Sequence, residues 1–170
     1  MDVHYLKRVM AEQVDLIRDL VTGVSPEQAR WKPDPDRWSI LEVINHLYDE
    51  ERGDFRAHLD QLLHDPGADW LPIDPMGWLI ERRYNERDLD MSLERFLVER
   101  RASLEWLEGL DAPDWELGME APWGAKMRAG DMLASWVVHG QWHIEQLIRL
   151  RRDYTIEKAH PYSADYAGTL

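Results

Sequence analysis

The chain has 170 residues and a formal net charge of -13 at pH 7, with 33 acidic against 20 basic residues; this length predicts one domain with a sizeable core. A chain this acidic repels phosphate backbones and anionic membrane surfaces, so we expect neither nucleic acid nor a membrane as a partner. The content of 44% hydrophobic residues excludes a disordered chain, and the lack of cysteine excludes disulfides, thiolate metal ligands and a cysteine nucleophile.

The first predicted helix covers residues 4–21, where apolar residues recur at every third or fourth position. Its beginning lacks the apolar core of a signal peptide, and no run approaches the ~20 apolar residues of a membrane span, so we expect a cytoplasmic protein. A short helical turn is predicted next. Ser25 suits a helix cap, Pro26 suits the first helical position, and Gln28 suits the third position of a capping box.

Three further long helices follow along the chain. The second, residues 39–64, has the clearest start, because Ser39 and Glu42 stand at the spacing of a capping box. The third is predicted from residue 88 or 90 to 109, and the fourth from 130 to about 152. Each carries apolar residues at helical spacing.

Two long connectors, residues 65–87 and 111–129, separate these helices and are rich in proline, glycine and tryptophan. Loops of ~20 residues are unusual in compact domains and are often functional. Part of the first connector, residues 76–84, is a candidate short helix, and no alternating pattern predicts a strand. We therefore predict an all-α protein: an antiparallel four-helix bundle over residues 1–152 with long connecting loops, followed by an irregular C-terminal tail over residues 153–170.

Two histidines of the fourth helix, His139 and His143, offer the clearest chemistry. Their spacing of four residues places both imidazoles on one helix face. The same face is apolar above and below them, with residues at steps of three and four: Met132, Trp136 and Leu147. A third histidine, His46, leans inward on the second helix. Three neutral imidazoles from two helices would hold a divalent metal ion and leave coordination positions open.

Each histidine can instead be a core residue that is hydrogen bonded to a backbone carbonyl or a carboxylate. A buried imidazole without any partner costs ~1–3 kcal/mol, so a partner of one kind or the other is required. The remaining histidines lie near helix ends, polar faces or the tail, and we expect them on the surface: His4, His58, His64 and His160.

The pair does not form the zinc hydrolase motif H-E-x-x-H, because Gly140 stands where that motif requires a glutamate as general base. The first candidate for a catalytic base is Glu50, one turn beyond His46 on the same face, and the second is Asp49. Either carboxylate can instead orient a ligand histidine or lie at a solvated edge. Gly140 also has a structural interpretation, since a small residue lets helices approach closely despite a propensity cost of ~1 kcal/mol.

The sequence also predicts where eight of the tryptophans and one charged run lie. Four tryptophans are expected in the core: Trp31, Trp38, Trp136 and Trp142. Four others lie in the connectors, where aromatic side chains can line a pocket over the metal: Trp70, Trp78, Trp115 and Trp123. We interpret the run Glu50-Glu51-Arg52 as a solvated helix face.

Three blocks of the sequence together resemble the DinB/YfiT-like superfamily of small four-helix-bundle metalloproteins. Residues 38–47, Trp-Ser-Ile-Leu-Glu-Val-Ile-Asn-His-Leu, are similar to that family's block W-S-x-x-E-x-x-x-H-L. Residues 139–147 are similar to its block H-x-x-x-H-x-x-Q followed by a hydrophobic residue, and residues 25–31 to its link S-x-E-x-x-x-W. The agreement in order and spacing covers most of the chain, from residue 4 to about 152.

The resemblance implies a divalent metal ion, either zinc, nickel or iron, held by His46, His139 and His143 with water in the remaining positions. It also implies a homodimer. For some members it implies transferase or isomerase activity with bacillithiol, mycothiol or similar low-molecular-weight thiols. The acidic charge of this chain gives no support for DNA binding.

The leading hypothesis is a metal-dependent enzyme that activates a low-molecular-weight thiol or water, because a bound cation lowers the pKa of either nucleophile. Its partners would be a small-molecule thiol or substrate, and the resemblance favours thiol transfer over hydrolysis. The alternative is a non-catalytic metal-binding bundle whose ion supports the fold, the dimer or ligand sensing. A third hypothesis is a metal-free helical interaction module.

Overall fold

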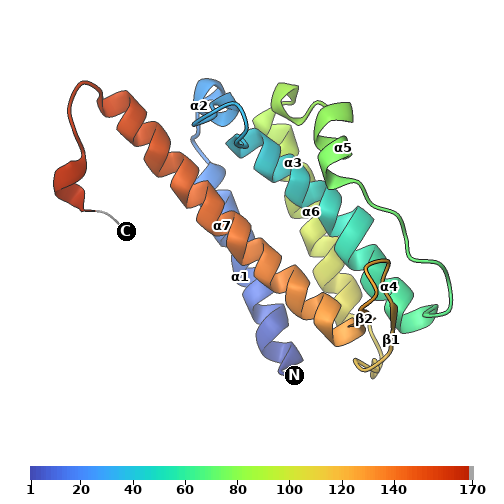
Figure 1. Cartoon of the computed structure of the whole chain (residues 1–170). Helices are drawn as coiled ribbons and strands as arrows, with labels where there is room; N and C mark the ends of the chain where they lie inside the picture. The colour runs from blue at the N-terminus through green and yellow to red at the C-terminus, as the bar shows by residue number, and fades with distance from the viewer. Residues whose placement is uncertain (169–170) are drawn as a thin grey trace.

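The computed structural model describes residues 1–168, and it confirms the predicted all-α four-helix bundle with long connecting loops (Figure 1). The long helices have the following bounds: α1 Val3–Val21, α3 Ile40–Glu50, α4 Arg56–His64, α6 Leu89–Glu108 and α7 Ala129–Ala159. The bundle has four long helical rods, which are α1, α3 with α4, α6 and α7. In the second rod, α3 and α4 are joined by a π-helical turn, Glu51–Phe55.

The connectors contain short elements of their own, most of them at the top and lower right of Figure 1. They are α2 Pro26–Arg30, α5 Pro75–Glu81, a 3-10 turn Tyr84–Glu86, and strands β1 Gly118–Glu120 and β2 Lys126–Arg128. Both predicted short helices, α2 and α5, are confirmed. The prediction that the chain contains no strand is wrong, because β1 and β2 form an antiparallel hairpin within the second connector. Strands of three residues are too short to produce a readable alternation.

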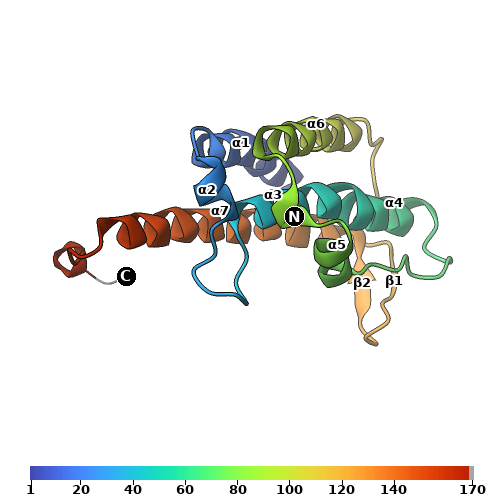
Figure 2. The same ribbon diagram turned by 90° about the horizontal axis from the view of Figure 1, so that it is seen from above.

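The bundle has two layers, which Figure 2 shows from above: α1 and α6 form one, and α3, α4 and α7 form the other. The neighbours α1 and α6 run antiparallel, and so do α7 and the α3–α4 rod (Figure 1). The first long connector returns the chain to the end where α3 begins, so α6 runs in the same direction as α3 and α4.

The apolar core is divided into two clusters, one toward each end of the bundle. One cluster is centred on Met10, Leu59, Leu62, Leu133 and Trp136. The other is centred on Ile17, Ile44, Leu47, Phe96 and Leu147. The segments between the two clusters, in α1, at the junction of α3 with the π-helical turn, in α6 and in α7, include buried or half-buried polar side chains: Gln13, Glu50, Glu51, Arg100, His139 and His143. The bundle therefore carries a polar layer across its middle.

The start of α3 is fixed by the predicted capping box. The backbone N–H of Glu42 donates to Ser39 Oγ at 3.1 Å, and the Ser39 N–H donates to Glu42 Oε2 at 2.7 Å. Both residues are buried. This reciprocal pair sets where α3 begins and therefore which way His46, two turns later, faces.

The C-terminal tail differs from the prediction. The segment 153–159, predicted to be irregular, continues α7 to Ala159 because no proline interrupts the helix before Pro161. A further 3-10 turn covers Asp165–Ala167, and residues 169–170 of the predicted tail lie outside the described residues. The end of α7 projects beyond the bundle (Figure 1). In residues 1–168 no helix has the length and apolar character needed to cross a membrane.

Candidate metal centre

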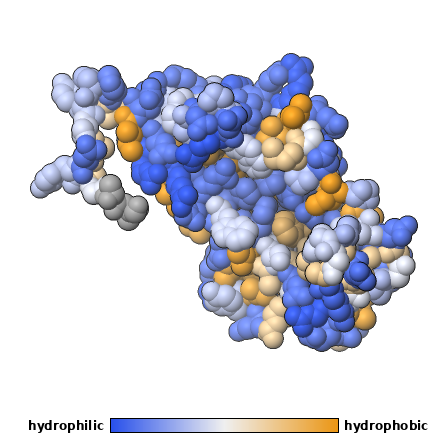
Figure 3. All heavy atoms as spheres, in the orientation of Figure 1, coloured by the Kyte–Doolittle hydropathy of each residue, from blue (hydrophilic) through white to orange (hydrophobic). Residues whose placement is uncertain are grey.

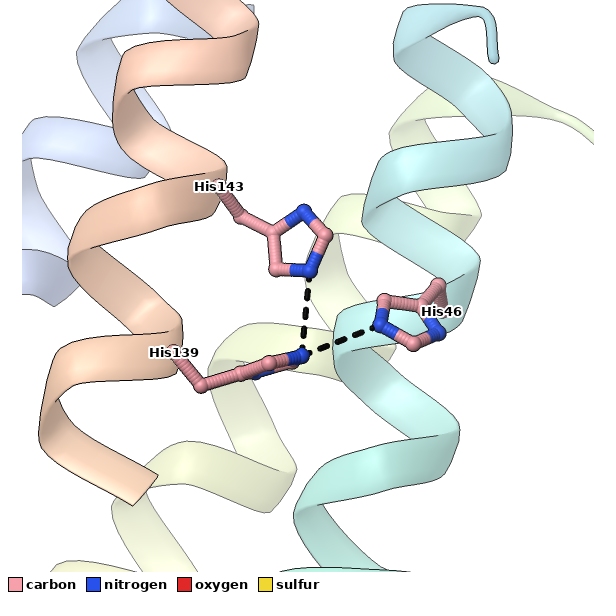
Figure 4. A group of neighbouring side chains, drawn as sticks. All are labelled: His46, His139 and His143. Carbon is pink, nitrogen blue, oxygen red and sulfur yellow. Dashed lines mark hydrogen bonds between the residues drawn. The ribbon is translucent and has the colours of Figure 1, made fainter. Parts of the chain in front are cut away.

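The structure brings the three predicted histidines together between α3 and α7 (Figure 4). His139 and His143 point from α7 toward α3, and His46 points back from α3. His139 Nε2 lies 3.1 Å from His46 Nε2 and 3.0 Å from His143 Nε2. Nitrogens that share a tetrahedral zinc ion lie about 3.3 Å apart, because each Zn–N bond is about 2.0–2.1 Å long. Two of the three separations therefore have the spacing of zinc ligands, and the ligand atoms of all three side chains lie within 4.8 Å of one another.

Hydrogen bonding alone cannot satisfy these three nitrogens. A neutral imidazole nitrogen offers either one N–H or one lone pair. His139 Nε2 faces two partners, so it can make a good bond to only one of them at a time. A cation at the shared point would accept a lone pair from all three rings. The donor set thus fits a divalent ion better than it fits a histidine cluster alone.

The bundle also keeps these rings neutral. Burial, with a smaller contribution from the charge of His143, lowers the pKa of His46 to about 3. Burial, followed by the neighbouring histidines His143 and His46, lowers the pKa of His139 to about 2. Burial lowers the pKa of His143 as well. Neutral imidazole is the form that binds a metal, so the three rings are prepared for binding at neutral pH.

Aromatic and amide side chains hold the rings in place. Trp38, which precedes the capped start of α3, packs edge-on against His46 at 4.7 Å and parallel to His143 at 6.1 Å between ring centroids. On the other side, the ring of Phe55 lies 4.9 Å from that of His139. Gln146 Oε1 lies 2.8 Å from His143 Nδ1, which fixes this ring with Nε2 toward the centre.

One side of the centre opens to solvent. His143 lines a cleft of about 360 Å³ together with Asp36, Arg37, Trp38 and Gln146. Of the residues described, only His46, His139 and His143 belong to this group of possible ligands, and no fourth histidine, aspartate or glutamate joins them. An ion held here would have open positions that face the cleft.

The two predicted carboxylates occupy different places. Glu50 Oε1 lies 3.6 Å from His46 Nδ1, on the opposite side of the ring from the shared point, and neither atom has a hydrogen-bond partner within residues 1–168. Burial, and then Asp54 and Asp49, raise the pKa of Glu50 to about 9. Its position suits the orientation of His46 better than contact with a substrate.

Asp49, the second candidate base, does not reach the histidines. Its carboxylate pairs with Arg82 at 2.6 Å and accepts a hydrogen bond from the Tyr84 hydroxyl. Both partners belong to the segment that follows α5. Asp49 therefore links the first connector to α3 through an ion pair and a hydrogen bond.

A buried ion pair lies behind the metal centre. Glu51 Oε1 and Arg100 Nε are 2.7 Å apart, and both side chains are only 1% exposed. Arg100 also donates to Gln13 Oε1 at 3.0 Å, and the indole N–H of Trp136 donates to Glu51 Oε2 at 3.1 Å. The network connects all four long rods at the level of the histidines.

Four sequence-based expectations about single residues are wrong. Glu50 and Glu51, predicted on a solvated face, are both buried, and Arg100 supplies a charge partner for Glu51. His58, predicted on the surface, is buried between Asp54 and the carbonyl of Leu71. Trp142, predicted in the core, is 67% exposed. It lies about 100° around the helix from His143, away from the inward stripe.

The other three surface histidines are exposed as predicted: His4, His64 and His160.

Comparison with known proteins agrees with this architecture. The model of the DinB superfamily matches residues 10–147, which is most of the chain. The chain belongs to the DinB superfamily. The matched residues include the three histidines, and the match confirms the family resemblance inferred from the three sequence blocks.

Among solved structures, YfiT from Bacillus subtilis is similar with a TM-score of 0.79 and 18% sequence identity, over 89% of this chain and 87% of that chain. YfiT is described as "a probable metal-dependent hydrolase with an unusual four-helix bundle topology". At this identity the likeness shows a common fold. None of the curated proteins searched matches the chain.

Gly140 gives a test of the packing around the centre. A Cβ at this position would lie 2.3 Å from Gln13 Oε1, and Gln13 is held by Arg100 and by its own bond to the Val137 carbonyl at 2.8 Å. We expect Gly140→Ala to destabilise the protein by about 1–3 kcal/mol in urea unfolding, although alanine favours a helix. Gln141→Ala, next to it on the exposed face, is the control. Equal stability of the two variants would contradict this account.

Proposed function

We propose that this protein is a divalent-metal-dependent enzyme in which His46, His139 and His143 hold the ion. The observation that most supports the proposal is the convergence of three imidazole nitrogens, with separations of 3.0 and 3.1 Å, beside an open cleft. Structural zinc sites have four protein ligands and are closed. Catalytic sites have three protein ligands and an open position.

The ion would be zinc, nickel or iron, since imidazole ligands suit these borderline cations. When bound, such an ion lowers the pKa of a coordinated thiol or water, so that a nucleophile is available near neutral pH. The family resemblance supports a low-molecular-weight thiol as this nucleophile, and the description of YfiT as a hydrolase supports water. We propose thiol transfer as the first reaction to test and hydrolysis as the second.

The remaining residues would position the ligands. Glu50 would orient His46 through Nδ1, and Gln146 would orient His143 through its Nδ1. Trp38 covers two of the rings and would limit the access of water from its side. The cleft next to His143 would admit the thiol or the substrate.

The test compares metal-loaded and chelated protein in two assays. One follows conjugation of a low-molecular-weight thiol to 1-chloro-2,4-dinitrobenzene, and the other follows hydrolysis of p-nitrophenyl acetate. We expect at least one reaction to be much faster with the metal-loaded protein, to disappear on chelation, and to return when the ion is added back. His143→Ala should lack this activity, and His64→Ala, which changes an exposed histidine, should keep it.

The alternative, a non-catalytic metal-binding bundle, predicts a different outcome. In that case chelation would lower the melting temperature while both assays remained at the rate of the metal-free protein. Purified protein that holds no metal, when no chelator has been used, would contradict both and favour a metal-free helical module.

A further inference from the structure

A second cavity lies next to the metal centre, at the lower end of the bundle. It has a volume of about 430 Å³, within the range of 300–1,000 Å³ typical of small-molecule sites. Four segments form its walls: the π-helical turn, the 70–73 part of the first connector, the tip of the hairpin and the first turns of α7. Figure 3 shows apolar side chains at the surface of this lower part of the molecule, among hydrophilic ones.

The lining of this cavity is apolar and carries no cation. Aromatic, proline, isoleucine and methionine side chains make up most of it, and only Asp54 and Ser135 contribute polar side chains. One oxygen of Asp54 is already paired with His58 Nδ1 at 2.7 Å. Among residues 1–168, no lysine, arginine or histidine lines the cavity to receive a carboxylate or phosphate. The cavity therefore suits an uncharged apolar group.

The aromatic wall is held in place by the buried side chain of His58. The His58 side chain is 0% exposed, its Nε2 lies 2.9 Å from the carbonyl oxygen of Leu71, and its ring stacks on Trp70 at 4.3 Å. Trp70 in turn contacts Trp123 of the hairpin edge-on, with centroids 5.4 Å apart. His58, which the metal centre does not use, thus fixes the connector that forms this wall.

The cavity and the metal centre share a wall. Phe55 lines the cavity, and its ring lies 4.9 Å from that of His139. Ser135 lines the cavity one turn before His139 on α7, a rise of about 6 Å. The loop before α3, the α5 segment and the hairpin project from the same layer of the bundle (Figure 2). A ligand seated in the cavity would therefore lie beside the Phe55 ring and about one turn of α7 from His139.

We propose that this cavity binds an uncharged aromatic or branched aliphatic group of a small-molecule substrate whose reacting group lies at the three histidines. The second part of this proposal rests on the proposed function, and the first part does not. The substrate is accordingly apolar at one end and carries its electrophilic or hydrolysable group at the other.

The test titrates the metal-loaded protein with N-phenyl-1-naphthylamine, an uncharged fluorescent probe. We expect saturable binding to the wild type, about tenfold weaker binding to Trp123→Ala, which removes an aromatic contact, and no binding to Ser135→Trp, which fills the cavity. Trp142→Ala is the matched control, because Trp142 is 67% exposed and Trp123 62% exposed, and only Trp123 lines the cavity. Absence of binding to the wild type, or equal losses in the two tryptophan variants, would overturn the proposal.

Two further measurements separate this proposal from the metal-dependent function. Trp123→Ala should retain the metal content of the wild type in elemental analysis, and His139→Ala should bind the probe within about twofold of the wild type. If the protein binds the probe but holds no metal, the cavity proposal is supported and the metal-dependent function is rejected. Metal without probe binding would reject the cavity alone.

Discussion

Replacing His139 with alanine is expected to lower the affinity for a divalent metal by about a hundredfold to a thousandfold. His139 Nε2 lies close to both of the other ligand nitrogens, at 3.1 and 3.0 Å. Its loss leaves only two imidazoles to hold the ion. Zinc bound by four ligands contributes about 10–16 kcal/mol, which corresponds to roughly 2.5–4 kcal/mol for each ligand. A loss of that size is a hundredfold to a thousandfold in affinity.

The measurement is elemental analysis of the purified protein together with melting temperature against added zinc. An ion at a hundred times its dissociation constant stabilises the folded state by about 2.7 kcal/mol, so the wild type should melt at a higher temperature with metal present. His139→Ala should show little change. His64→Ala, whose side chain is 59% exposed, should behave as the wild type. Equal metal content in the two variants would dismiss the proposed site.

The position of the three histidines could be predicted because each lies in step with apolar residues. On α7, His139 and His143 share a face with the apolar residues Met132, Trp136 and Leu147. All three apolar residues are buried in the structure, so this face points into the bundle. That His46 meets them depends on which helix packs against α7, and the support for this pairing came from the family resemblance. Helix periodicity gives the face of one helix and not the neighbour that it meets.

Helix periodicity also indicates the buried position of three residues that were predicted on the surface or were not considered. Glu51 follows Leu47 by four positions, His58 follows Phe55 by three, and Arg100 follows Phe96 by four; all three lie on inward stripes and are buried. A charged residue on an apolar stripe indicates a buried partner. The identity of that partner depends on tertiary structure, since 49 positions separate Glu51 from Arg100 in the chain.

The connectors could be predicted least well. The π-helical turn, Glu51–Phe55, and the hairpin carry no periodic signal of their own, because each contains too few residues. Their arrangement is decided by contacts with the bundle, such as the stacking of Trp70 on His58. The cavity that these segments form was therefore not visible from the sequence, although aromatic residues in the connectors indicated that a pocket could form there.

Loss of the Arg100 charge is expected to destabilise the protein by about 3–5 kcal/mol. Arg100 and Glu51 are both 1% exposed and 2.7 Å apart, so Arg100→Met leaves a carboxylate in the interior without its cation. Removing one member of a buried pair costs this much because the remaining charge is neither solvated nor paired. Arg101→Ala, at an exposed neighbouring position, should change stability by no more than about 0.5 kcal/mol.

Urea unfolding of the chelated proteins measures this effect apart from metal binding. The double variant Glu51→Gln/Arg100→Met removes both charges and keeps an oxygen that can accept the hydrogen bond from the Trp136 indole. Because exchange of a buried ion pair for uncharged groups of similar volume is often close to neutral, the double variant should be more stable than Arg100→Met alone. If both unfold at the same urea concentration, the cost arises from packing around Arg100 and not from the unpaired carboxylate. In the expected case, the ion pair fixes how the four rods meet behind the histidines, and its charge contributes little net stability.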